Sequence, residues 1–120
     1  MFQGAIEFNG SVNGWNTSNV TNMYNMFNGA SNFFGGGAGV PGVNYWDVSG
    51  VTDMRNMFEN AGSVAVPPAN RFRRDLKLWN VKTATPVDQM FRGTSMPTDN
   101  TPPDNYWPNF NRSPLPTNLF

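Results

Sequence analysis

The chain has 120 residues and a formal net charge of zero, with eight basic and eight acidic side chains. A neutral chain has no long-range field that would recruit nucleic acid or an anionic membrane surface. The sequence contains neither cysteine nor histidine, which excludes disulfides and thiolate chemistry and removes the most common general base and metal ligand.

One block occurs three times and dominates the sequence. Each copy begins at a tryptophan and runs over a fixed spacing to a Met-Phe pair. The copies start at Trp15, Trp46 and Trp79 and reach Met26-Phe27, Met57-Phe58 and Met90-Phe91. A fixed internal spacing seen three times in a short chain indicates a repeat protein. The first residues, 1–5, match the end of a unit, so we expect the sequence to start in the middle of one.

The stretch that leads into each tryptophan is predicted to be a short strand. The copies are residues 12–17, 43–48 and 76–81, and residues 104–109 form a degenerate fourth. When strands follow one another in the same direction with a helix between them, they pair in parallel and the helices lie behind the sheet.

The segment after each tryptophan is predicted to be a short helix. Candidate N-caps are Thr21, Thr52 and Thr85, and candidate stop residues are Gly29, Asn60 and Gly93. Apolar residues between these signals fall at helical spacing. A helix of about two turns does not hold alone in water, so its apolar face must be buried against the rest of the protein.

These elements predict an α/β repeat: a short solenoid of parallel strands and short helices. The solenoid would occupy residues 1–96, with units near 9–30, 40–61 and 73–94. The proline-rich residues 97–120 would form a C-terminal cap that closes the stack.

The repeated large residues are the candidate core, because they can fill an interior that the units share. They are Trp15, Met23, Met26, Phe27, Trp46, Met54, Met57, Phe58, Trp79, Met90 and Phe91. The face that the tryptophans occupy stays open at this point. They could instead form an exposed aromatic platform for sugar rings or for a partner.

Alternation along a strand would turn a second apolar set to the opposite face. Together with the uncovered N-terminal end of the stack, this set gives the candidate partner-contact residues. They are Val43, Tyr45, Leu76, Leu78, Tyr106, Met1 and Phe2. We expect a partner, another copy of the chain or a further segment to cover that end, because stacked repeats need caps to stay soluble.

Three patterns that could suggest other chemistry have simpler interpretations. The glycine run 35–39 lacks the Lys-Ser/Thr ending of a phosphate-binding loop. The basic cluster 71–77 contains Asp75 and lies in a neutral chain, which favours a solvated face. Asp47 occupies the position of Asn16 and Asn80 in the other copies, so an amide serves there equally well. This predicts a turn-forming role and not acid–base catalysis.

The repeated pattern Trp-Asn/Asp-x-Ser-x-Val-Thr-x-Met-x-x-Met-Phe-x-x-Ala resembles the BspA-type leucine-rich repeat, a mycoplasma-lipoprotein-type unit that is also found in viral proteins. Residues 15–30 and 46–61 match closely, and residues 79–94 depart at Lys82, Ala84, Pro86, Val87 and Thr94. The resemblance implies a right-handed solenoid, surface display and protein contact, usually adhesion. It brings no catalytic residues.

The sequence therefore predicts a non-enzymatic structural or protein-interaction module without catalytic residue, cofactor or metal. A virion structural or decoration protein is the first choice, because the array is short and shows neither an export signal nor a lipid-attachment cysteine. A fragment of a cell-surface adhesin and a carbohydrate-binding module with aromatic rows are the alternatives. The expected partners are further copies or neighbouring subunits, with a glycan possible, and the expected location is a virion or cell surface.

Overall fold

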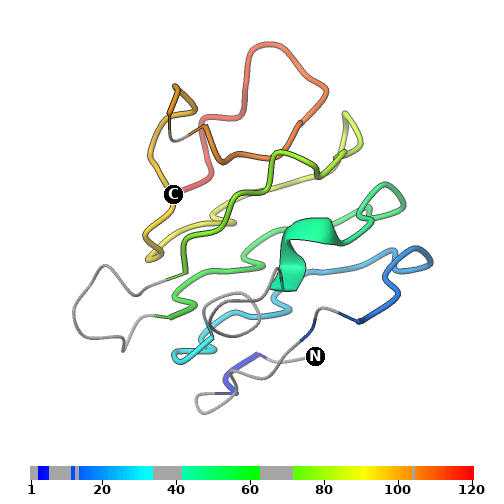
Figure 1. The fold of residues 1–120 in the computed structure, drawn as a ribbon, viewed down its shortest axis with the longest axis vertical. Coiled ribbons are helices and arrows are strands. Elements are labelled where there is room, and N and C mark those ends of the chain that lie inside the picture. Colours follow the sequence, from blue (N-terminus) through cyan, green and yellow to red (C-terminus); the bar gives the residue numbers. More distant parts are fainter. Residues whose placement is uncertain (1–2, 6–11, 13, 34–41, 63–71, 104) are drawn as a thin grey trace.

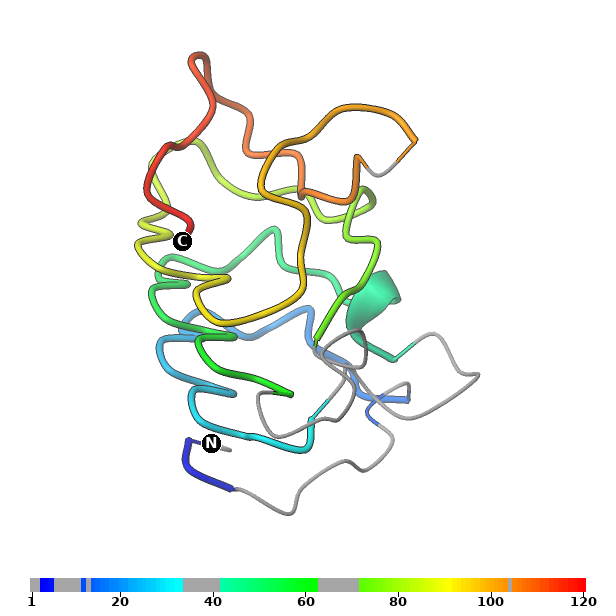
Figure 2. The same cartoon turned by 90° about the vertical axis from the view of Figure 1, so that its left-hand side faces the viewer.

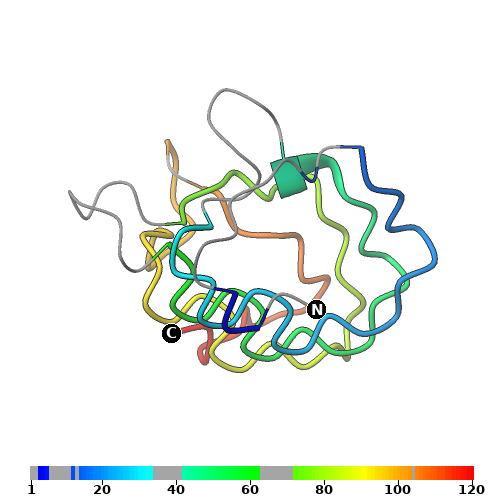
Figure 3. The same cartoon turned by 90° about the horizontal axis from the view of Figure 1, so that it is seen from below.

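Successive coils of the chain stack on one another in the computed structural model, which describes residues 3–5, 12, 14–33, 42–62, 72–103 and 105–120. The N-terminal coil lies at one end of the stack and the C-terminal residues at the other (Figure 1), and the side view shows the same order (Figure 2). Seen along the stack, the coils overlie one another around a common interior (Figure 3). Regular elements are few within these residues: the 3-10 helix η1 (Gly42–Tyr45) and two isolated parallel bridges, Asn22↔Asp53 and Asn80↔Asn109.

One side of each coil is a run of tight turns, which we call the turn ladder (residues 22–30, 53–61 and 86–94). Backbone amides there alternate between two kinds of acceptor. Met23 N donates to Asp53 O of the next coil at 2.9 Å, whereas Met26 N donates to Met23 O of its own turn at 3.2 Å. The same alternation continues through Phe27 and Ala30 and repeats in the second coil. Both turns and stacking therefore satisfy the backbone, without a helix or a regular strand.

The short α-helices predicted after each tryptophan are wrong. Asn25, Asn56 and Gln89 have φ between 53° and 58°, in the middle of the segments concerned. A positive φ at the third residue of a four-residue turn is what a type II turn requires, and it cannot occur inside an α-helix. The predicted stop residues do take the left-handed conformation: φ is 72° at Gly29, 60° at Asn60 and 75° at Gly93.

Two of the three threonines predicted as N-caps, Thr52 and Thr85, bond between coils instead. Thr85 Oγ1 is buried and donates to Val51 O at 3.0 Å, and Thr52 Oγ1 donates to Thr21 O at 3.0 Å. Because no helix begins at these positions, there are no orphan helix amides for the hydroxyls to cap. The hydroxyls satisfy carbonyls of the preceding coil.

The opposite part of each coil, which we call the tryptophan side (residues 12, 14–20, 43–51 and 76–83), also turns every three residues. Trp46 N donates to Val43 O at 3.2 Å, and Trp79 N donates to Leu76 O at 2.9 Å. The predicted strands over 43–48 and 76–81 are therefore not regular strands, although residues 79–81 do pair with Asn109. A period of three places Val43 and Trp46 on the same, inward face.

Aromatic rings form the centre of the stack. The Phe58 ring stacks on Phe27 at 5.6 Å and on Phe91 at 6.2 Å, and it lies 4.1 Å from Phe72 between ring centroids. The tryptophan side is tied in by indole hydrogen bonds across coils. Trp79 Nε1 donates to Val43 O at 2.8 Å, and Trp46 Nε1 to Val12 O at 3.1 Å.

The C-terminal residues lie along the third coil. Asn109 pairs with Trp79 and Val81, and Gln89 and Phe91 donate to the carbonyls of Asn118 and Leu119. Phe110 and Leu119 are buried. The tail thus accepts hydrogen bonds from the third coil, as the third coil does from the second.

Candidate functional site

The residues predicted as repeat core lie inside the stack, with one exception. The buried members are Met23, Met26, Phe27, Trp46, Met54, Met57, Phe58, Trp79, Met90 and Phe91. Trp15 was predicted to belong to this set and does not, because 38% of it is exposed. Its ring stacks on Trp46 at 5.8 Å, whereas Trp46 and Trp79 themselves are buried.

The residues predicted to contact a partner divide into two groups. Val43 and Leu76 are fully buried, so their assignment to an outward face is wrong; the three-residue turn explains the error. Tyr45 is 67% exposed and Leu78 is 70% exposed. Tyr106 is half-buried, with the Arg73 guanidinium 4.8 Å from its ring centroid. Met1 and Phe2 lie outside the described residues.

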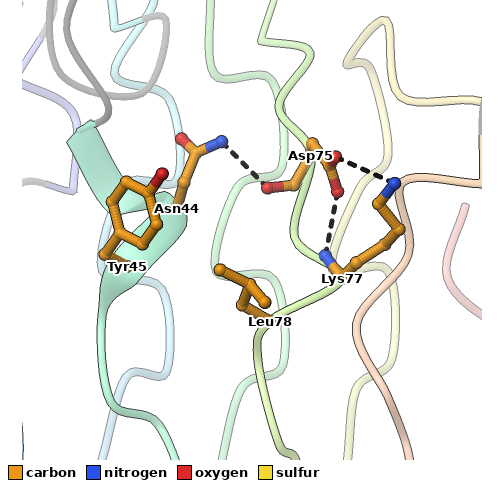
Figure 4. Close-up of a pocket in the computed structure, with 5 residues that line it drawn as sticks. All are labelled: Asn44, Tyr45, Asp75, Lys77 and Leu78. Atoms are coloured by element: carbon orange, nitrogen blue, oxygen red, sulfur yellow. Dashed lines mark hydrogen bonds and ion pairs between the residues drawn. The ribbon is translucent and has the colours of Figure 1, made fainter.

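Tyr45 and Leu78 occupy the same place in consecutive coils, immediately before the tryptophan. They line a hollow of about 250 Å³ together with Asn44, Asp75 and Lys77 (Figure 4). Tyr45 and Asn44 come from η1 in the second coil, and the other three residues come from the third. The hollow therefore exists only because the two coils are stacked.

Polar contacts fix the walls of this hollow. Asn44 Nδ2 donates to the Asp75 carbonyl at 2.9 Å and so links the two coils. Asp75 Oδ1 accepts from the Lys77 backbone amide at 3.1 Å, and Asp75 Oδ2 lies 3.3 Å from Lys77 Nζ. The carboxylate and ammonium side chains are still 40% and 48% exposed. Two large apolar side chains and one ion pair therefore face solvent side by side.

Three other aspartates, Asp47, Asp53 and Asp99, accept hydrogen bonds within their own turns. Asp47 Oδ1 accepts from the Ser49 amide and hydroxyl at 3.0 and 2.6 Å, and Asn16 makes the same two bonds with Ser18. The turn-forming role predicted for Asp47 is confirmed. These bonds, the hydroxyl first, lower the pKa of Asp47 below its usual value.

A second exposed cluster lies on the turn ladder. Arg55 covers the Tyr24 ring at 5.2 Å and pairs with Asp53 at 2.7 Å. The Arg55 side chain lowers the pKa of Asp53, chiefly through these hydrogen bonds. Tyr24 is 48% exposed but already has a partner for its ring face. This cluster offers less free apolar surface than the hollow does.

Sequence reasoning missed two residues: Phe72, which belongs to the core, and Asn44, which lines the hollow. Phe72 was read as part of a basic cluster, yet it is buried against Phe58 and Phe33. Asn44 was not singled out, because its link to Asp75 depends on the stacking of two coils. Asn44 and Asp75 are 31 residues apart, close to the 33 that separate Trp46 from Trp79, and this spacing could have suggested their contact.

Comparison with models of known protein families assigns the chain to one of them. A family model described as "Mycoplasma protein of unknown function, DUF285" matches residues 1–101. The chain belongs to this family. Searches of curated proteins and of solved structures gave no match.

Two further observations concern the described residues alone. No helix in them is long and apolar enough to cross a membrane. Within the same residues, no group of three or more acidic side chains is placed to hold a metal ion.

Proposed function

We propose that this member of the mycoplasma repeat family is a non-enzymatic protein-interaction module displayed on a surface. The observation that carries the proposal is the pair Tyr45 and Leu78. Both side chains are about two-thirds exposed, although every other large apolar residue among residues 42–62 and 72–96 is buried in the stack. Exposed aromatic and aliphatic side chains on a rigid frame are typical of contact sites.

The way the aspartates are used supports a non-enzymatic role. Asp47 and Asp75 each accept hydrogen bonds from residues two positions on, which fixes local turns. A general acid or base needs a free titrating group aimed at a substrate. The sequence also lacks histidine and cysteine altogether.

The stack supports the architectural part of the proposal, that of a short leucine-rich-repeat-like solenoid. Hydrogen bonds run from Met23 to Asp53 and from Met54 to Pro86, between equivalent positions of successive coils. An experimentally determined structure with the same ladder is the expected result. An antiparallel pairing of these segments would contradict the proposal.

Photo-crosslinking tests the function. A photoreactive phenylalanine analogue is placed at position 45 or 78 of the full chain in its native particle or cell, with position 24 as the matched exposed control. We expect protein adducts from positions 45 and 78 and few from position 24. Equal adducts at all three positions, or none at 45 and 78, would contradict the proposal.

The same experiment identifies the partner and the location. Mass spectrometry of the adduct distinguishes a second copy of this chain from a neighbouring subunit. Protease treatment of intact virions or cells tests display, because a displayed chain is digested before the particle opens. A virion structural or decoration protein is recovered with purified particles, and an adhesin fragment with the cell surface.

A further inference from the structure

We propose that the hollow between Tyr45 and Leu78 binds one neutral sugar ring carried by a glycosylated partner. The inference rests on the proposed function and deepens it, because it names the chemical group that this face receives. The argument uses the size, the lining and the charge of the hollow.

Size limits the ligand to a single ring. The volume of the hollow is about 250 Å³, below the roughly 300–1,000 Å³ of pockets for drug-sized ligands. The hollow is lined from two sides, by Asn44 and Tyr45 of the second coil and by Asp75, Lys77 and Leu78 of the third (Figure 4). A long apolar segment of a partner would need a continuous groove, whereas one ring fits between two side chains.

The lining suits a molecule with an apolar face and a polar edge. Tyr45 and Leu78 supply exposed apolar surface, and the tyrosine ring is large, stiff and amphipathic. A pyranose presents C–H groups on one face and hydroxyls around its rim. The ring face would lie on Tyr45, with its hydroxyls turned toward Asp75 and Lys77.

The charge of the hollow favours a neutral ligand. Asp75 and Lys77 pair at 3.3 Å, so their charges offset each other. An anion such as phosphate would meet the carboxylate, and a cation would meet the ammonium. A hydroxyl both donates and accepts, so it can bond to the carboxylate or to the ammonium while their ion pair remains. Neighbouring hydroxyls of one ring match this adjacent acceptor and donor.

The walls are held in place before any ligand arrives. Asn44 ties the second coil to the Asp75 carbonyl, and the Trp79 indole ties the third coil to Val43, next to Asn44 in the chain. Asp75 is fixed further by the Lys77 amide. Preorganised walls reduce the entropy lost on binding, which matters most for a ligand that makes few contacts.

Chemical-shift titration tests the proposal. The ¹⁵N-labelled full chain is titrated with the methyl glycosides of glucose, galactose, mannose and N-acetylglucosamine. We expect at least one glycoside to shift the amides of residues 44, 45, 77 and 78 with a Kd on the order of millimolar. Tyr45→Ala should weaken this binding by about tenfold, and so should Asp75→Ala.

Matched variants separate this site from general surface effects. Tyr24→Ala removes another exposed tyrosine, on the turn ladder, and Lys82→Ala removes an exposed lysine outside the hollow. Both should leave glycoside binding within about twofold, since the affinity of independent sites is not coupled. Retained spectral dispersion shows that each variant is folded.

The outcomes also separate this inference from the proposed function. Equal loss in Tyr24→Ala, or shifts that map away from the hollow, would overturn the sugar site. Binding of N-acetylphenylalanine amide in place of every glycoside would overturn it too, and would assign the hollow to a partner side chain. In either case, protein adducts at positions 45 and 78 would still support the proposed function. Only the absence of such adducts would remove both the proposed function and the sugar site.

Discussion

The two sides of each coil differ in how strictly they repeat. On the turn ladder, equivalent residues of successive coils share the sign of φ, the alternation of amide donors and the stacked phenylalanine. On the tryptophan side, the residue before each tryptophan changes from Gly14 to Tyr45 to Leu78, and all three are exposed. η1 is formed in the second coil alone among the described residues.

This difference shows which side builds the fold and which can vary. A change at a buried position of the turn ladder, such as Met57 or Phe58, meets the coils on both sides and is constrained by both. A change in the residue before the tryptophan meets solvent, because the three-residue turn sends only Val43, Trp46 and their equivalents inward. Contact surfaces can therefore differ between coils of the same stack without cost to its interior.

The largest effect is expected in the middle of the turn ladder. Phe58→Ala removes a ring that contacts Phe27, Phe72 and Phe91. We expect the free energy of unfolding to fall by about 3–5 kcal/mol, measured by urea denaturation. Phe120→Ala, at the partly exposed end of the stack, is the control and should cost clearly less. Equal losses would mean that the rings do not form one continuous core.

The next largest loss of stability is expected from Gly93→Ala, at a backbone position that has no room for a side chain. A Cβ on Gly93 would lie 2.2 Å from Asn60 Oδ1, whereas a Cβ on Gly29 would meet nothing closer than 3.7 Å. Both glycines have positive φ, which costs an alanine about 1–2 kcal/mol. Gly29→Ala should show this cost alone, and Gly93→Ala should lose more because the Asn60 side chain must move.

A double variant tests the cause of that difference. Asn60→Gly removes the side chain that a Cβ at residue 93 would strike. In the Asn60→Gly background, the cost of Gly93→Ala should fall close to that of Gly29→Ala, with only the Cα of residue 60, at 3.3 Å, still tight against the new Cβ. The same denaturation series measures this cost. An unchanged cost in the double variant would place the strain elsewhere in the turn.

The sequence contained most of this ladder but suggested the wrong local structure. Apolar residues at Met23, Met26 and Phe27 fit an α-helix and a run of three-residue turns equally well, because both bring residues i and i+3 to one face. What separates the two is the residue between them. Asn25 and Asn56 adopt positive φ, and asparagine tolerates that conformation better than most side chains.

Only part of the candidate site could be predicted from the sequence. Tyr45 and Leu78 were singled out together with Val43 and Leu76, because a period of two was assumed for the stretch before the tryptophan. The observed period of three buries Val43 and Leu76 and leaves the other two exposed. The hollow itself depends on Asn44 reaching Asp75 in the next coil, a contact that no single repeat contains.

A smaller loss of stability is expected when a threonine hydroxyl is removed where the turn ladder meets the tryptophan side. Thr85 Oγ1 is buried and donates to Val51 O, whereas Thr52 Oγ1 is exposed and donates to a carbonyl that also accepts the Thr52 amide. Thr85→Val should therefore lower the free energy of unfolding by about 1–3 kcal/mol, the cost of an unsatisfied buried carbonyl. Thr52→Val should cost about 0.5 kcal/mol or less. Equal costs would show that burial does not decide the difference.

The smallest expected change in stability concerns a turn that occurs in two copies, of which only one carries a titrating side chain. Asn16 and Asp47 accept the same hydrogen bonds, but only Asp47 titrates. Its pKa is lowered in the folded chain, so its contribution to stability is complete above the unfolded value of about 3.9 and is lost as pH falls through the folded value.

Asp47→Asn should therefore leave the free energy of unfolding unchanged at neutral pH, since an amide already makes this turn in the first coil. In acid, the variant should lose less stability than the parent chain does. Asp53, whose pKa Arg55 lowers on the turn ladder, would contribute to the acid loss that remains. Denaturant titrations of both proteins at neutral and acidic pH provide the measurement. Parallel pH profiles would show that protonation of Asp47 does not weaken its turn, and that the two copies differ in sequence but not in response to acid.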